Sequence, residues 1–211
     1  MNTHQPQPST LARLRSCIPG HNQVTWPEAL RIAELHANRL LELNNVTTGP
    51  TPVEIITTLP KISVRYVDQP VAGASFWDPR SRRWVIHVNR YDSRVRKRFT
   101  IAHEYKHIID HGATDRLYPD SRRAVNQREA AADYFAACLL MPRRLVKQAW
   151  GRGIQRIPDL AAHFQVSEQA MKYRVDQIGL VDRDYEPVRR CVPPREASAW
   201  NRAPMPAGAR S

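Results

Sequence analysis

The chain has 211 residues, of which 42% are hydrophobic, and a formal net charge of +12. This length allows one domain of ordinary size with appendages. It contains no apolar run of the roughly eighteen residues that a membrane span needs, and its polar N-terminus does not resemble a signal peptide. Three scattered cysteines (Cys17, Cys138 and Cys191) argue against a disulfide framework and favour a reducing cytoplasm.

The positive charge leaves two kinds of partner open. A basic chain attracts nucleic acid, and it also attracts acidic proteins. Arginines gather between positions 80 and 98 and again after position 188, but they are spaced widely enough to be ordinary solvated side chains. We weigh nucleic-acid contact and solvated faces equally from charge alone.

The first half of the chain begins with residues 1–25, where Pro, Ser, Gln and Asn occur without periodicity and predict a disordered arm. A helix is predicted from Trp26, with Thr25 as its N-cap and Pro27 in its first turn. Its apolar face continues to Leu41. A short second helix follows over residues 53–59.

Three strands are predicted next. Residues 62–67 alternate apolar and polar side chains, and residues 72–77 and 84–88 form a hairpin with a longer polar loop. An open strand edge beside a catalytic cleft could bind a substrate segment by strand addition. A purely structural sheet fits these residues equally well.

The next predicted helix carries His103-Glu104-x-x-His107 and runs to about His111, with its N-terminus capped by the residues up to Ser93. Residues four apart lie on one face about 6 Å apart along the axis, so both imidazoles can bind one zinc ion. Glu104 is rotated by about 100° from His103, so its carboxylate lies beside the metal and can take a proton from water.

A catalytic zinc needs a third protein ligand. His111 would lie about 12 Å from His103 on a straight helix, which is too far, and we interpret it as a helix-end residue. Glu129 and Asp133, four apart on an Ala-rich second helix that Pro142 closes, are better placed. One carboxylate can bind zinc while the other accepts the outer N–H of a ligand histidine. Both would otherwise be ordinary surface acids, but with the upstream motif we favour Glu129 as the ligand.

Residues 157–180 predict two helices joined by a tight turn at 165–167, as in a helix-turn-helix. Ser167 would cap the second helix, with Glu168, Gln169, Lys172 and Tyr173 facing outward. In a DNA reader this helix would enter the major groove. We favour a helical hairpin packed on the preceding domain, because the acids of this segment offset its few cations.

Two segments of the chain resemble the ImmA/IrrE family of metallo-endopeptidases. The matching segments are Arg-Phe-Thr-x-Ala-His-Glu-x-x-His from Arg98 to His107, and the Glu-to-Leu-Met-Pro segment from Glu129 to Pro142. The chain departs from the family pattern at Tyr105-Lys106, at Ala131 and at Asp133. The resemblance implies a thermolysin-like zinc site and cleavage of a DNA-binding repressor that controls mobile-element or stress-response genes.

We therefore predict an α+β fold in which a small antiparallel sheet packs on zincin-type active-site helices, followed by a helix-turn-helix-like segment. The predicted boundaries are a disordered arm at 1–25, a zinc metallopeptidase domain at 26–150, the helix-turn-helix-like segment at 151–182 and a disordered basic tail at 183–211.

The predicted function is that of a cytoplasmic zinc metallo-endopeptidase. His103, His107 and Glu129 bind Zn²⁺, Glu104 is the catalytic base, and Asp133 orients a ligand histidine. Tyr134 or an arginine is the candidate for stabilising the oxyanion. The expected partner is a helix-turn-helix repressor, with only weak nucleic-acid binding and no membrane. The competing hypothesis is a DNA-binding regulator with a vestigial metal site.

Overall fold

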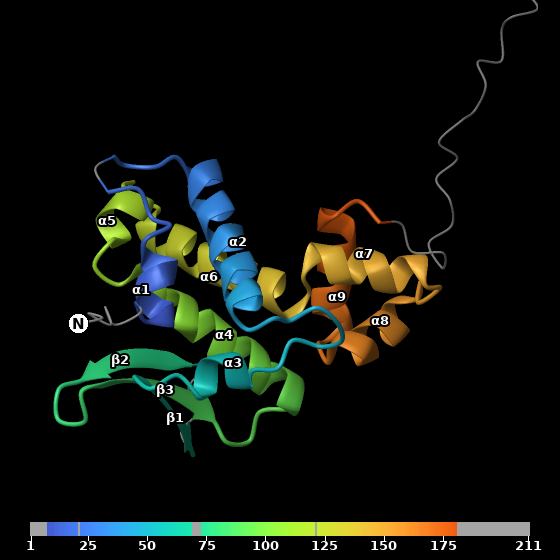
Figure 1. The fold of residues 1–211 in the computed structure, drawn as a ribbon, viewed down its shortest axis with the longest axis horizontal. Coiled ribbons are helices and arrows are strands. Elements are labelled where there is room, and N and C mark those ends of the chain that lie inside the picture. The colour runs from blue at the N-terminus through green and yellow to red at the C-terminus, as the bar shows by residue number, and fades with distance from the viewer. Residues whose placement is uncertain (1–7, 21, 69–72, 121, 181–211) are drawn as a thin grey trace, which may run out of the picture.

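The computed structural model describes residues 8–20, 22–68, 73–120 and 122–180 (Figure 1). The helices in these ranges are α1 (Thr10–Arg15), α2 (Trp26–Leu43), α3 (Glu54–Thr57), α4 (Arg94–Asp110), α5 (Thr114–Leu117), α6 (Ala124–Leu140), α7 (Arg143–Gly151), α8 (Ile157–Phe164) and α9 (Glu168–Gln177). The strands are β1 (Ile62–Val67), β2 (Ala74–Asp78) and β3 (Arg83–Asn89). None of the described helices is long and apolar enough to cross a membrane.

Helix α4 lies between a helical layer and the sheet (Figure 1). Helix α6 packs against α4 and also against α2, while β2 and β3 contact α4 from the other side. The buried face of α6 includes Ala131, Ala132 and Ala136, whose small side chains let the neighbouring helices approach closely. The prediction of an α+β fold is confirmed, and its central helix is the one that carries the metal motif.

The three strands form a mixed sheet in the order β1-β3-β2. Strands β2 and β3 form the predicted antiparallel hairpin, but β1 runs parallel to β3, with Ile62 opposite Trp84. The expectation of a wholly antiparallel sheet is therefore wrong for β1. Strand β3 takes the centre because it is the most apolar strand, with Val85 and Ile86 fully buried, and a central position covers both of its edges. The β2 edge that does not face β3 carries no further strand among the described residues.

Part of the N-terminal segment that we predicted to be disordered forms helix α1, so the prediction for residues 1–25 is wrong at Thr10–Arg15. Leu14 is fully buried in the main core. The guanidinium of Arg15 donates to the carbonyl oxygens of Ile108 at 2.7 Å and Ile109 at 3.2 Å. These carbonyls belong to the last turn of α4, where a helix has no partners of its own for them. Residues 1–7 lie outside the described residues.

The C-terminal helices α8 and α9 share the core of α6 and α7 through Leu160, Phe164, Met171 and Val175. The turn between them lies where we predicted it. Gln165 takes a left-handed conformation at the end of α8, and the Ser167 hydroxyl caps α9 by accepting from the Ala170 N–H. The domain boundaries at residues 150 and 182 stay predictions, and the predicted tail at 183–211 lies outside the described residues.

Candidate metal centre

Helix α4 presents its two motif histidines side by side. The Ser93 hydroxyl caps the helix by accepting from the Arg96 N–H, as predicted, so the helix starts early enough to pass through the motif in regular geometry. One turn then separates the two imidazoles, and the Nε2 atoms of His103 and His107 lie 3.1 Å apart. The sequence prediction that these rings share one face of one helix holds.

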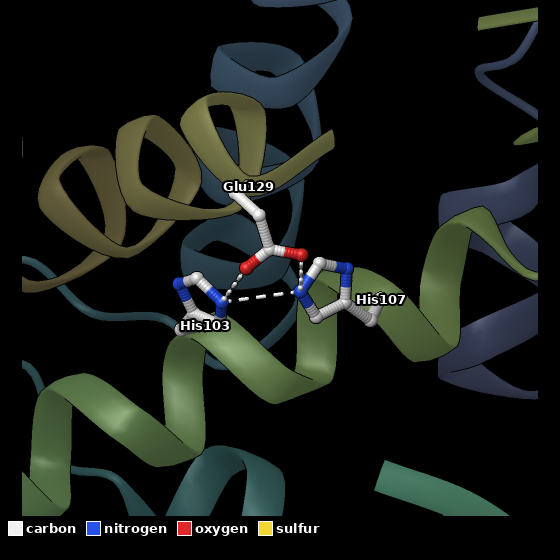
Figure 2. A group of neighbouring side chains, drawn as sticks. All are labelled: His103, His107 and Glu129. Atoms are coloured by element: carbon white, nitrogen blue, oxygen red, sulfur yellow. Dashed lines mark hydrogen bonds and ion pairs between the residues drawn. The ribbon is translucent and has the colours of Figure 1, made fainter. Parts of the chain in front are cut away.

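Glu129 approaches the same point from α6 (Figure 2). Its Oε2 lies 3.2 Å from His103 Nε2, and its Oε1 lies 3.5 Å from His107 Nε2. All three ligand atoms lie within 4.8 Å of one another. A tetrahedral zinc site with bonds of about 2.0 Å has edges of about 3.3 Å, close to the distance from each histidine Nε2 to its nearer Glu129 oxygen. The donor set therefore fits zinc in both its chemistry and its spacing.

The far side of His103 contacts Asp133, one turn after Glu129 on α6. Asp133 Oδ1 lies 2.8 Å from His103 Nδ1. A carboxylate accepts from Nδ1–H and thereby leaves the Nε2 lone pair free to face the metal. This is the contact that the role predicted for Asp133 requires.

The two histidines differ in basicity. Burial alone lowers the pKa of His103, but the hydrogen bond and charge of Asp133, together with the nearby glutamates, raise it above its usual value. Burial and the neighbouring His103 lower the pKa of His107 to about 4. At neutral pH, His107 is therefore uncharged and able to donate a lone pair to a cation.

Glu104 points into the same cleft and is only 6% exposed. Burial raises the pKa of its carboxyl, and a hydrogen bond from the Ser75 hydroxyl to Oε2, at 2.8 Å, opposes that rise. On the same side of Glu104, a Cβ added to Gly73 would lie 2.7 Å from Oε1. The segment at β2 thus fixes the carboxylate from one side.

Neither Ser75 nor Gly73 was a predicted site residue. An isolated glycine at the start of a strand is a known sign of close backbone approach, and that signal was present at Gly73. Ser75 carried no such signal, because its contact depends on how the sheet docks against α4.

A cleft of about 760 Å³ extends from this site, and its volume is in the usual range for ligand sites. His103, Glu104, Glu129 and Asp133 line it on the side of α4 and α6, and the opposite wall comes from the N-terminal part of α9. The Glu129 side chain is 47% exposed, so the centre is open to solvent. An open side is what a catalytic metal site needs and a structural one lacks.

The other residues that the sequence placed near the site either lie away from the metal centre or already have partners of their own. His111 ends α4, and its ring packs against Trp84 with centroids 4.8 Å apart. Tyr134 lines the cleft, but its hydroxyl donates to Glu34 Oε2 at 3.2 Å. Lys106 does not line the cleft. It is fully buried and pairs with Asp110.

Comparison with known proteins agrees with this geometry. A family model for peptidase M78, described as the IrrE N-terminal-like domain, matches residues 61–176. No curated protein gives a significant match. A solved structure of a Mycobacterium tuberculosis transcriptional regulator shares the fold, with a TM-score of 0.58 at 18% identity, over 80% of this chain and 52% of that one. This chain thus spans about half the length of that protein.

The family match covers the strands, both histidines, Glu129 and the C-terminal helix pair. The resemblance to ImmA/IrrE proteins is confirmed, and the chain belongs to the peptidase M78 family, through an IrrE N-terminal-like domain.

Proposed function

We propose that this protein is a zinc-dependent endopeptidase. The observation that carries the proposal is that the two histidine Nε2 atoms lie 3.1 Å apart and each lies within 3.5 Å of a Glu129 oxygen, with Asp133 behind one of the histidines. Surface acids and histidines that meet by chance have no reason to converge on one point from two helices. The membership of a metallopeptidase family supports the same conclusion.

His103, His107 and Glu129 would hold the ion, which when bound supplies a Lewis acid that polarises a peptide carbonyl and lowers the pKa of a water. Glu104 accepts the proton of the attacking water. Its burial makes it more basic than a solvated glutamate, so it can retain that proton and pass it to the leaving amine. Ser75 keeps the carboxylate turned toward the cleft while this happens.

The substrate that we propose is a partner helix-turn-helix repressor, in line with the ImmA/IrrE resemblance. Two features of the structure support a protein substrate. The cleft is lined by residues from α4 to α9, and Gly73, which directly precedes the edge strand β2, lines it as well. An extended substrate segment could add to that edge through main-chain hydrogen bonds.

The test compares zinc content and cleavage in matched variants. The protein purified from metal-replete medium should hold about one zinc per chain. Glu104→Gln should keep the zinc and lose at least about a hundredfold in cleavage rate, the usual scale for a general base. Ser75→Ala should keep the zinc and lose about tenfold, because one hydrogen bond to a charged group is removed.

The probe substrates are any helix-turn-helix repressor found to be encoded beside this gene, with unfolded casein as a generic probe. Cleavage by Glu104→Gln at the native rate would refute the mechanism. A native protein that binds zinc and cleaves none of these probes would refute the peptidase function.

The competing function is a DNA-binding regulator with a vestigial metal site. The capped helix-turn-helix geometry of α8 and α9 favours it, and so does the similarity in fold to a protein described as a transcriptional regulator. It predicts sequence-specific duplex binding without peptidase activity. Our proposal predicts weak, sequence-blind DNA binding that falls steeply as salt rises. Competition between an operator-like duplex and random duplexes near physiological salt separates the two functions.

A further inference from the structure

Part of the exposed face of α9 that a DNA reader would use borders the metal cleft. Gln169 and Tyr173, two of the four residues that we expected to face outward, line the same cleft as His103 and Glu129. Val166, Ser167 and Ala170 line it as well. This wall comes from a segment whose role the metal site does not explain.

Two buried arginines attach α9 and its preceding turn to the metal helices. The Arg174 side chain, 2% exposed, donates from Nε to the carbonyl of Met141 at the end of α6, at 3.0 Å. Arg98 on α4 donates from Nε to the Gln165 carbonyl at 3.2 Å and from Nη2 to the Thr51 carbonyl at 2.9 Å. Met171 is fully buried on the inner side of α9. Helix α9 and the turn before it are therefore held against α4 and α6 by buried contacts.

Many of the residues that line the cleft near this wall are apolar. The apolar lining residues come from three helices and from the residues that follow α6 and precede α9: Phe99, Ala137, Met141, Val166, Ala170 and Tyr173. Tyr173 is 67% exposed, a large aromatic surface left in water at the mouth of the cleft. Lys172, the exposed cation of α9, does not line the cleft. The lining residues that α9 contributes are uncharged and suit an apolar side chain, whereas Arg96, which also lines the cleft, lies on α4.

The charges of the helix pair argue the same way. The exposed charged side chains of α8 and α9 are Lys172 against Asp159, Glu168 and Asp176. Moreover, a recognition helix must stand clear of its own domain to enter a groove about 12 Å wide. Gln169 and Tyr173 are exposed but border the metal cleft of their own domain, so a duplex that met them would have to enter beside α4 and α6.

We infer that α9 and the residues facing it form a substrate-binding subsite that holds an apolar side chain of the polypeptide next to the bond being cleaved. Tyr173 is its specificity-determining residue and packs over that side chain from the cleft mouth. This inference rests on the proposed peptidase function, because the metal centre is what brings a peptide into the cleft.

The experiment measures binding separately from cleavage. Fluorescently labelled ten-residue peptides of one sequence, with Leu, Phe, Ser or Asp at the central position, are titrated by anisotropy against the full-length, zinc-loaded Glu104→Gln protein. The Leu and Phe peptides should bind at least about tenfold more tightly than the Asp peptide. Adding Tyr173→Ala should remove most of this preference, whereas adding Tyr91→Ala should not. Tyr91 is a matched control because it is also highly exposed, at 76%, but does not line the cleft.

A second variant tests the shape of the subsite. Ala170→Phe adds a large side chain at a partly buried position of α9 that lines the cleft, and it should shift the preference from Phe toward Ser in the protein that folds, as checked by its unfolding curve. Equal binding of all four peptides, absence of binding up to about millimolar peptide, or identical effects of Tyr173→Ala and Tyr91→Ala would each overturn the inference. So would a large loss of sequence-specific duplex binding in Tyr173→Ala.

Failure of the proposed function gives a different result. If the Glu104→Gln protein shows the predicted preference but the native protein hydrolyses none of the peptides it binds, the subsite stands and the peptidase assignment falls. If the native protein cleaves peptides with no preference that depends on Tyr173, the peptidase assignment stands and the subsite falls.

Discussion

Helix α4 carries a polar cluster on each of two faces, and the two clusters differ in whether their donors and acceptors satisfy one another. On the buried face, Lys106 pairs with Asp110, and Asp110 also accepts from the Tyr118 hydroxyl at 2.7 Å. On the cleft face, His103 and His107 direct their Nε2 atoms at each other and at Glu129. The first cluster joins donors to acceptors, whereas the second gathers acceptors around one point.

A structural cluster can be distinguished from a functional one by whether its polar groups satisfy each other. A buried cation, a carboxylate and a hydroxyl satisfy each other and need nothing from outside. Lone pairs that face each other repel unless protons or a cation lie between them, and burial together with the neighbouring His103 already disfavours a proton on His107. The buried cluster should therefore contribute to stability alone, and the cleft cluster should respond to metal. Four predictions test this division.

The largest expected effect is on the buried face. Lys106→Ala leaves the Asp110 carboxylate buried without its cation, which should lower the free energy of unfolding by about 3 to 5 kcal/mol. Zinc stoichiometry in the folded fraction should not change. The measurement is urea unfolding at neutral pH.

Arg39→Ala is the matched control, because the Arg39–Glu42 pair lies on the surface and should contribute less than about 1 kcal/mol. A Lys106→Ala protein as stable as the Arg39→Ala protein would show that the buried pair does not stabilise the fold.

The next effect is the stabilisation of the folded protein by zinc. At a free zinc concentration of about a hundred times the dissociation constant, binding should add about 3 kcal/mol to the free energy of unfolding. His107→Ala should abolish this gain, whereas His111→Ala should keep it, because His111 packs on Trp84 at the helix end. Unfolding curves with zinc and with a chelator measure the difference. Loss of the gain in both variants would contradict the proposed ligand set.

The third effect concerns Asp133, which would act on the metal only through its contact with His103. Asp133→Ala should weaken zinc binding by about ten- to a hundredfold, the usual range for a residue that orients a ligand. Asp133→Asn should lose less, because an amide oxygen can still accept from His103 Nδ1–H. A chromophoric zinc chelator in competition gives both affinities, with the exposed Asp159→Ala as a control. Unchanged affinity in Asp133→Ala would remove this residue from the site.

The smallest effect is a pH dependence on the buried side. Burial, with the nearby Lys106, lowers the pKa of His36 to about 3. The unfolded chain takes up a proton on this histidine below about pH 6.5, but the folded protein does not, so stability falls as pH falls from about 6.5 toward 3. The loss should be roughly 1 kcal/mol per pH unit.

His36→Leu isolates this contribution from those of the cleft histidines. In chelator, the native protein should lose about 1 kcal/mol more than His36→Leu between pH 6.5 and 5.5. Equal losses in the two proteins would mean that His36 is not held neutral.

Several features of the fold and site follow from residues that are close together in the sequence. The two histidines are one turn apart, and Glu129 and Asp133 are one turn apart on a second helix, so their pairing on faces could be derived from helical periodicity. The bounds of β1, the cap at Ser93 and the turn before Ser167 were also readable, because each depends on a few neighbouring side chains and their backbone preferences.

Other features depended on contacts between distant segments. Nothing near Arg15 in the chain shows that it binds the last carbonyls of α4, and nothing near Ser75 shows that it reaches Glu104. The sequence likewise placed Gln169 and Tyr173 on the outer face of α9, where both are exposed, but that they line the metal cleft depends on the packing of α9 through Arg174 against Met141. Local patterns fix which side chains share a face of an element. Which element that face meets is decided by how all the apolar faces are buried together, and one segment of the chain does not contain that information.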